Sequence, residues 1–220
     1  MSNILHIETA TKACSVALSK NGNLIALEEI NDGEYSHAEN ITLLIQKAIE
    51  KAGIEMKDLN AVSVSSGPGS YTGLRIGVST AKGICYALSI PLIAIDSLQA
   101  LAQLGFEKYP NQTICPLIDA RRMEVYNTIY SEKEVLLKPI SADIIDEHSY
   151  AEFEPFVYLG DGAKKLQEIW SNKNCKADLT IFSSAKGQIK PAFEKFQKKQ
   201  FEDVAYFEPF YLKDFVAGKK

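Results

Sequence analysis

Residues 61–88, which read AVSVSSGPGSYTGLRIGVSTAKGICYAL, constrain the fold of this chain more than any other stretch. They begin as a short apolar strand, break at the glycine-rich sequence SSGPGS, and continue as a segment rich in small residues that we expect to be a helix. A strand, a glycine-rich turn and a helix N-terminus gather unpaired backbone N–H groups around one point. That arrangement suits either an anion or a closely approaching backbone, and Gly67 and Gly69 provide the backbone freedom for both.

The expected helix 72–88 carries small residues at regular intervals. Gly73, Gly77 and Ala81 recur every four residues, with Thr80 and Gly83 close by. Because a glycine inside a helix costs up to about 1 kcal/mol relative to alanine, three glycines require an offsetting gain. A smooth helix face provides one, since it lets another subunit or this chain's own sheet approach closely. Both alternatives remain open at this point.

The phosphate-binding motifs of nucleotide enzymes do not occur in this stretch. A P-loop requires G-x-x-x-x-G-K-[ST], whereas Gly73 is followed by Leu74 and Arg75. The dinucleotide motif G-x-G-x-x-G is also missing from the sequence. The glycine pattern therefore does not by itself predict nucleotide binding.

The composition is typical of a soluble globular protein, with 46% hydrophobic and 24% charged residues. A net charge of −4 argues against unaided binding to nucleic acid or to an acidic membrane surface. The three arginines, Arg75, Arg121 and Arg122, lie in or beside the glycine-rich and DARR segments. We interpret Arg75 as an anion contact, and Arg122 as an arginine placed by chance in a lysine-rich chain.

Cysteine usage and terminal sequence indicate a cytoplasmic protein. None of the four cysteines forms C-x-x-C, so we expect reduced thiols. The sequence MSNILHIETAT does not resemble a signal peptide, and no apolar run approaches the roughly 20 residues of a membrane span.

The order of the expected elements predicts two α/β lobes, residues 1–105 and residues 106–220. In the first lobe we expect strands at 4–7, 14–19, 24–30, 61–64 and 91–95, and helices at 36–52, 72–88 and 96–102. An Asn-Gly turn joins the second and third strands. In the second lobe we expect strands at 113–118, 124–130 and 156–159, and helices at 141–147, 163–170 and 184–199. This order is typical of mixed sheets with covering helices.

The sequence offers few groups for catalysis. The three histidines, His6, His37 and His148, have no metal-ligand spacing, so we expect no metal site, and no G-x-S-x-G nucleophile motif occurs. Four acids lie near strand ends, where α/β proteins collect ligand groups: Glu8, Asp96, Asp119 and Asp161. Each is also a common capping or turn residue, but together they indicate a cleft between the lobes.

Several segments in fixed order resemble the TsaB family, also called YeaZ. They are Glu8-Thr9, SSGPGSYTGLRIGVSTAKG (65–83), PLIAIDSL (91–98), DARRMEVY (119–126), GDGA (160–163) and PFYLK (209–213). The GPGSYTGLRIG core is specific to that family, whereas the flanking motifs are individually weak. The tail reads Tyr-Leu-Lys where the family more often has Tyr-Leu-Arg.

The resemblance implies an actin/hexokinase/Hsp70-like (ASKHA, ribonuclease H-like) fold of two α/β lobes. It also implies a non-catalytic paralogue of TsaD that pairs with TsaD and with the ATPase TsaE. The complex would transfer a threonylcarbamoyl group to the adenosine beside the anticodon of ANN-decoding tRNAs. Ser97 and Leu101 stand where TsaD-type sequences carry two metal-binding histidines, so that metal centre cannot be built here.

In this family the helices 36–52 and 72–88 form the dimer surface, with TsaD or with a second copy. The resemblance thus assigns an interface to Ser36, Ile41, Ile45, Thr72, Gly73, Ile76, Gly77, Thr80, Ala81 and Ile84. On this basis we expect Gly77→Leu to abolish pairing while the monomer stays folded.

A degenerate nucleotide or anion site is a further expectation, without a firmly bound cofactor, although ATP or ADP could bind through the complex. Its candidate residues are Glu8, Thr9, Gly67, Gly69, Ser70, Asp119, Gly160, Asp161 and Gly162. We expect tRNA to be contacted only within the complex. The alternative function is a stand-alone ATPase or peptidase-like enzyme that uses the interlobe cleft.

Overall fold

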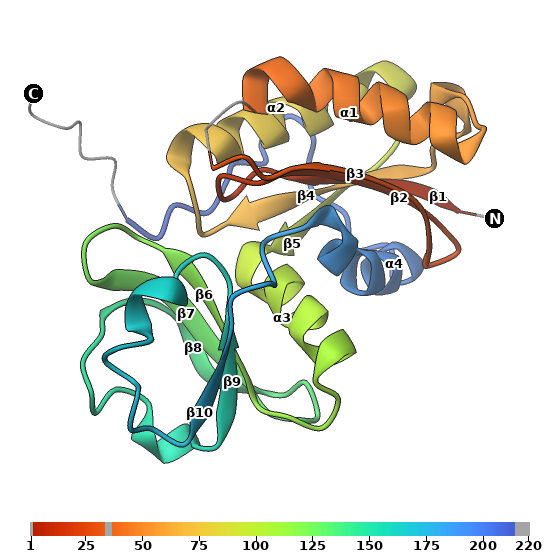
Figure 1. Ribbon diagram of the computed structural model, residues 1–220. Helices are drawn as coiled ribbons and strands as arrows, with labels where there is room; N and C mark the ends of the chain where they lie inside the picture. Colours follow the sequence, from red (N-terminus) through yellow and green to blue (C-terminus); the bar gives the residue numbers. More distant parts are fainter. Residues whose placement is uncertain (1, 34–36, 214–220) are drawn as a thin grey trace, which may run out of the picture.

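The computed structural model describes residues 2–33 and 37–213, which form two five-stranded sheets (Figure 1). The first sheet has the order β3-β2-β1-β4-β5. Its strands are β1 (Asn3–Glu8), β2 (Cys14–Lys20), β3 (Asn23–Ile30), β4 (Ala61–Gly67) and β5 (Leu92–Asp96). The first three form an antiparallel meander, and β4 and β5 add in parallel. Left-handed Asn21 and Gly22 make the β2–β3 turn, as the Asn-Gly pair predicts.

Apolar side chains project from both faces of this first sheet, and helices cover both faces. The helices α1 (His37–Ala52) and α2 (Tyr71–Leu88) lie on one face (Figure 1). The helices α3 (Ser97–Lys108) and α4 (Ile189–Gln197), the latter preceded by the 3-10 turn η4 (Ala185–Gln188), lie on the other. In β1, Leu5 and Ile7 pack into the α1–α2 core, whereas Ile4 packs with Ala192 of α4. Each fully buried aliphatic side chain stabilises the fold by about 1.5–3 kcal/mol.

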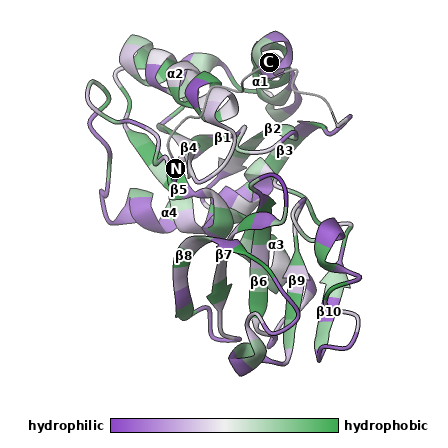
Figure 2. Ribbon diagram, turned by 90° about the vertical axis from the view of Figure 1, so that its left-hand side faces the viewer, coloured by the Kyte–Doolittle hydropathy of each residue, from purple (hydrophilic) through white to green (hydrophobic). Residues whose placement is uncertain are grey.

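The second sheet has the order β10-β9-β6-β7-β8. Its strands are β6 (Ile114–Asp119), β7 (Glu124–Tyr130), β8 (Leu136–Ile144), β9 (Phe156–Leu159) and β10 (Cys175–Asp178). One face packs on α3 through Leu98 and Leu101, so α3 lies between the two sheets. The other face holds a core around Trp170, whose ring meets Phe156 and Tyr158 edge to face. Figure 2 shows β6 and β9 as mainly hydrophobic strands.

The predicted lobe boundary differs from the structure at its C-terminal end. Residues 106–220 were expected to form the second lobe, but the chain returns to the first lobe after β10. Ala192, Phe193 and Phe196 of α4 pack under the first sheet, and the Glu202 N–H donates to the Leu92 carbonyl at 2.9 Å. The physical reason is that α3 alone does not cover the whole of this apolar face of the first sheet. The apolar side of α4 covers the remainder.

Two predicted helices are wrong, and two strands, β8 and β10, were not predicted. The expected helix 141–147 is mostly the end of β8, because Ser141 to Ile144 pair with β7. The expected helix 163–170 contains only the 3-10 turn η3 (Lys164–Leu166). The strand β10 was missed because its four residues, CKAD, are too few for their alternation of apolar and polar side chains to mark a strand. Two further 3-10 turns are η1 (Met56–Asp58) and η2 (Ala151–Phe153).

The four cysteines are free, and three of them are buried. Burial raises the pKa of the Cys14 thiol to about 11 and that of Cys85 to about 12, which keeps both protonated and unreactive at neutral pH. Across the described ranges, none of the helices combines the length and apolar character needed to cross a membrane.

Asp96 provides a test of how burial couples the fold to pH. Its Oδ1 accepts a hydrogen bond from the Gln99 N–H at 2.9 Å and caps α3, while burial raises its pKa to about 6. An acid with a raised pKa binds more protons in the folded state, so the free energy of unfolding falls as pH rises from about 4 to about 6. The control is Asp96→Asn, which keeps the cap but does not titrate. Relative to this variant, we expect the free energy of unfolding of the wild type to fall by roughly 1–3 kcal/mol over this pH window. Urea unfolding of both proteins at about pH 4 and pH 7 measures this difference. If the unfolding free energies of the wild type and of Asp96→Asn changed equally with pH, the prediction would be wrong.

Candidate functional site

A cavity of about 480 Å³ lies where the two lobes meet, and we call it the interlobe cleft. Three segments line it: the β4–α2 turn, the β6–β7 hairpin and residues 210–213 of the C-terminal tail. The lining residues are Gly69–Thr72, Asp119–Arg122, Glu124, Tyr126 and Phe210–Lys213. The cleft therefore brings together Gly69, Ser70 and Asp119 of the predicted anion site.

The β6–β7 hairpin presents Arg121 and Arg122 at the interlobe cleft. Both have left-handed backbones, with φ of 71° and 51°. This conformation costs on the order of 1 kcal/mol for a residue other than glycine, asparagine or aspartate. The hairpin is held by hydrogen bonds from Ala120 N to Glu124 O and from Glu124 N to Arg121 O, both 3.1 Å. The local sequence thus keeps two arginines in an unfavourable conformation.

The acids of this hairpin are held by neighbouring groups. Asp161 Oδ1 accepts from the Asp119 backbone N–H at 3.0 Å, and Lys165 Nζ lies 2.6 Å from Asp119 Oδ1. Glu124 pairs with Lys213 of the tail. Two cations therefore neutralise the two acids that line the cleft.

An aromatic and cationic cluster forms the wall of the cleft on the first lobe. The rings of Tyr71 and Tyr211 lie 4.7 Å apart, and the Arg75 guanidinium lies 4.1 Å from the centre of the Tyr71 ring. Arg75 Nε also donates to the Tyr211 hydroxyl at 3.2 Å. The Phe210 N–H donates to Ser66 O at 2.7 Å, which fixes the tail to the glycine-rich turn. Arg75, interpreted from sequence as an anion contact, is thus engaged within the chain.

The glycines of the turn serve close approach of the chain's own backbone. A Cβ at Gly67 would lie 2.3 Å from Phe210 O, and one at Gly69 would lie 2.4 Å from Ala10 O. The Ser70 N–H donates to Ala10 O at 2.6 Å. The backbone of this turn that a bound phosphate would contact is therefore already covered by the tail and by the β1–β2 turn. Of the two readings of this turn, the structure favours the closely approaching backbone.

The predicted anion-site residues Gly160 and Gly162 are likewise packed inside the second lobe. A Cβ at Gly160 would lie 2.3 Å from Leu117 O, and one at Gly162 would lie 3.1 Å from the Ile118 carbonyl carbon. Neither glycine lines the interlobe cleft. Their role in the structure is to let the chain after β9 pass close to β6.

Glu8 and Thr9 of the same predicted site are fully buried in the first lobe. Glu8 accepts hydrogen bonds from the Ser65 hydroxyl and, at 2.7 Å, from the Ala10 N–H. Burial raises the pKa of the Glu8 carboxyl, and these hydrogen bonds offset only part of that effect. Thr9 Oγ1 donates to Gly73 O at 2.8 Å. Neither side chain is open to a ligand.

Glu8 ends a buried chain of hydrogen bonds that the sequence analysis did not identify. Gln188 Nε2 donates to Ser65 Oγ at 3.0 Å, and Gln188 Oε1 accepts from Ser63 Oγ at 2.7 Å. His6 Nδ1 lies 2.6 Å from Ser63 Oγ, so His6 donates there. Burial lowers the pKa of His6 to about 3, which keeps the ring neutral. The signal in the sequence was the alternation of serines with apolar residues in β4.

The helix residues predicted for an interface divide between core and surface. Ile41, Ile45, Gly73, Gly77 and Ala81 are buried in the chain, so these five are not available to a partner in this conformation. Thr72 is exposed, and Ile76, Thr80 and Ile84 are partly exposed. Ser36 lies outside the described residues.

The reason for this division is the position of the glycines on α2. A Cβ at Gly73 would lie 2.1 Å from Thr9 O, and one at Gly77 would lie 2.3 Å from Thr9 Oγ1. Both glycines therefore let α2 approach the start of the β1–β2 turn. Gly83 has nothing within 4 Å of an added Cβ and lies on the outer face.

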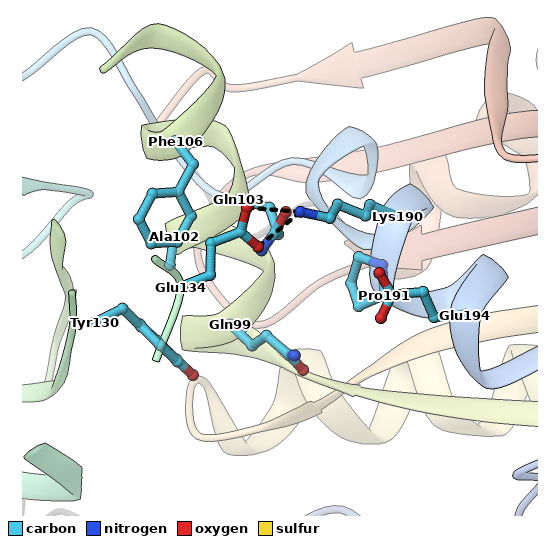
Figure 3. A pocket seen from close by; sticks show the side chains of 9 residues that line it. All are labelled: Gln99, Ala102, Gln103, Phe106, Tyr130, Glu134, Lys190, Pro191 and Glu194. Carbon is cyan, nitrogen blue, oxygen red and sulfur yellow. Dashed lines mark hydrogen bonds and ion pairs between the residues drawn. The ribbon is translucent and has the colours of Figure 1, made fainter. Parts of the chain in front are cut away.

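A second, smaller cavity of about 170 Å³ lies between α3, α4 and the β7–β8 hairpin (Figure 3). Glu134 reaches across it and binds Gln103 Nε2 at 2.9 Å and Lys190 Nζ at 2.6 Å. None of the predicted site residues lines it. Its polar groups thus mainly join the second lobe to the helices of the first. The described residues also contain no cluster of three or more His, Cys, Asp or Glu side chains that could hold a metal ion.

Comparison with known proteins agrees with this two-lobe architecture. The family model described as TsaD, tRNA N6-adenosine threonylcarbamoyltransferase, matches residues 32–218. The structure of YeaZ from Pseudomonas aeruginosa superimposes with a TM-score of 0.81 at 24% identity, covering 96% of this chain and 100% of that chain. An activator of 2-hydroxyisocaproyl-CoA dehydratase from Clostridium difficile superimposes at 0.54 with 13% identity, covering 91% of this chain and 98% of that chain. These neighbours confirm the actin/hexokinase-like (ASKHA) fold class.

Two curated relatives carry the same name. The tRNA threonylcarbamoyladenosine biosynthesis protein TsaB of Escherichia coli is 31% identical over 99% of this chain and 97% of its own length. TsaB of Bacillus subtilis is 35% identical over 64% of this chain and 60% of its own length. The family expected from the glycine-rich core and its flanking motifs is confirmed: the chain belongs to the TsaB (YeaZ) family of tRNA threonylcarbamoyladenosine biosynthesis proteins.

Proposed function

We propose that this protein is a non-catalytic partner subunit of TsaD in the formation of threonylcarbamoyladenosine beside the anticodon of ANN-decoding tRNAs. The observation that carries the proposal is the similarity to TsaB along nearly the whole chain. The geometry supports it, because Glu8 is enclosed in the first lobe while Asp119 and Glu124 are each held by a lysine. TsaE and tRNA would join the complex through TsaD, and the protein alone would form a homodimer in the cytoplasm.

The outer face of α2 is the surface that we assign to TsaD. It consists of Thr72, Ser79 and Gly83, which are exposed, and Ile76, Thr80 and Ile84, which are partly exposed. Short hydroxyl side chains, a glycine and isoleucines at helical spacing allow a second helix to approach closely. This surface keeps four of the predicted interface residues and replaces the buried ones.

The test is in vitro modification of an ANN-decoding tRNA by TsaD and TsaE, supplied with threonylcarbamoyl-adenylate, with and without this protein. We expect modification to require the protein and to be lost with Gly83→Arg, which places a long side chain on the outer face of α2 without an internal clash. Gln197→Arg, an exposed site on α4, is the matched control and should retain activity.

Modification without this protein would overturn the proposal. The alternative, a stand-alone ATPase that uses the interlobe cleft, predicts ATP hydrolysis by the purified protein that Asp119→Ala abolishes. We expect no hydrolysis above background.

A further inference from the structure

We propose that the interlobe cleft binds a segment of the substrate RNA, with Arg121 and Arg122 on its phosphodiester backbone and the aromatic wall against a base. This inference rests on the proposed function, because TsaD would bring the RNA to the cleft. It concerns a different surface from the outer face of α2.

The charge distribution favours a phosphate ligand in this cleft. The chain carries a net charge of −4, yet two of its three arginines lie side by side on the β6–β7 hairpin. The cleft acids Asp119 and Glu124 are neutralised by Lys165 and Lys213. Within the described ranges, the Arg121 and Arg122 side chains make no hydrogen bond or ion pair. The cleft therefore has two cations available for a ligand.

The backbone conformation of the hairpin indicates that these two arginines serve binding and not the stability of the fold. Arg121 and Arg122 both have positive φ, where asparagine and glycine are far less strained. Among the residues that the structure describes, neither guanidinium has a hydrogen bond or ion pair that would offset this strain. Strained residues of this kind gather at binding sites, where the surrounding structure holds them.

The opposite wall can take a nucleic-acid base. The rings of Tyr71 and Tyr211 lie 4.7 Å apart with their planes tilted by 38°, and Phe210 beside them is 49% exposed. Exposed aromatic rings next to cations are the combination by which proteins hold single-stranded nucleic acid, since every base has a face that can stack.

The same geometry favours an RNA strand over a free nucleoside triphosphate. Phosphate chains of free nucleotides are usually held by a nest of backbone N–H groups. Here the Ser70 N–H is bound to Ala10 O, and Gly67 is covered by Phe210 O. The cleft offers separate cations and ring faces instead, which match the spaced charges of a phosphodiester backbone.

The decisive variant is the double substitution Arg121→Asn with Arg122→Gly, studied as the complex with TsaD. It removes both cations but places residues suited to positive φ in the hairpin, so the protein should melt at a higher temperature. We expect affinity for an ANN-decoding tRNA, measured by fluorescence anisotropy, to fall at least tenfold. The slope of log affinity against log salt should decrease by about 1.5, as for two lost phosphate contacts.

The matched control is Lys198→Gln with Lys199→Gln, which removes two exposed positive charges away from the cleft. It should change tRNA affinity less than twofold. A cleft variant that binds tRNA as tightly as the wild type would overturn the inference. So would displacement of the tRNA by ATP from the wild type but not from the cleft variant, because the cleft would then hold a free nucleotide. If the wild-type protein does not bind TsaD in sedimentation, the proposed function itself fails.

Discussion

Gly73→Ala is expected to destabilise the protein by about 3 kcal/mol, although alanine is the better helix former. The added Cβ would lie 2.1 Å from the carbonyl oxygen of Thr9, a backbone atom that cannot rotate away. The clash would also disturb the hydrogen bond from Thr9 Oγ1 to Gly73 O, which is 2.8 Å long. Urea unfolding followed by circular dichroism measures the change.

Gly83→Ala is the control for this prediction, on the same helix. Nothing lies within 4 Å of its added Cβ, so the substitution should stabilise the protein by about 0.5–1 kcal/mol through helix propensity alone. If Gly73→Ala proved as harmless as Gly83→Ala, the close contact between α2 and Thr9 would be wrong.

The same contact corrects the expectation for Gly77→Leu. A Cβ there would already lie 2.3 Å from Thr9 Oγ1, and a leucine would extend further into the buried contact with β4. The monomer would therefore not stay intact, and loss of pairing in this variant would report damage to the fold. A substitution on the outer face, such as Gly83→Arg, tests pairing without that damage.

Gln188→Leu should cost about 2–4 kcal/mol, because it interrupts the buried hydrogen-bond chain at its centre. Gln188 Nε2 donates to Ile7 O at 2.8 Å and to Ser65 Oγ at 3.0 Å, and its Oε1 accepts from Ser63. All of these groups are out of contact with water, so water cannot replace the lost hydrogen bonds. Thermal and urea unfolding measure the loss.

Gln197→Leu, nine positions further along the chain and exposed, should change stability by no more than about 0.5 kcal/mol. Equal stabilities of the two variants would show that the buried chain contributes little to the fold.

The first lobe was predictable because its signals are local. The Asn21-Gly22 turn, the short apolar run in β1 and the strand–turn–helix unit of residues 61–88 each depend on neighbours in sequence. The second lobe was less predictable. Residues 141–147 combine polar and apolar residues in a pattern that fits a helix, and only pairing with β7 makes most of them a strand.

The candidate site was predictable in composition but not in geometry. The glycine-rich turn satisfies two requirements equally well in sequence, anion binding and close approach of backbone. Only the positions of Ala10 O and Phe210 O, supplied by distant parts of the chain, decide between them. Conversely, the hairpin that carries Arg121 and Arg122 has no glycine or asparagine to mark it as a tight turn, so its left-handed backbone was not expected.

The return of residues 185–212 to the first lobe has a consequence for synthesis on the ribosome. The sheet that begins with the first strand of the chain is covered on one face by α4, which is among the last elements to leave the exit tunnel. The buried polar groups of β1 and β4 likewise form their hydrogen bonds with Gln188 only after that residue has been synthesised. The N-terminal lobe thus finishes folding only after the second lobe has been made, and the nascent chain must keep that face from aggregating in the meantime.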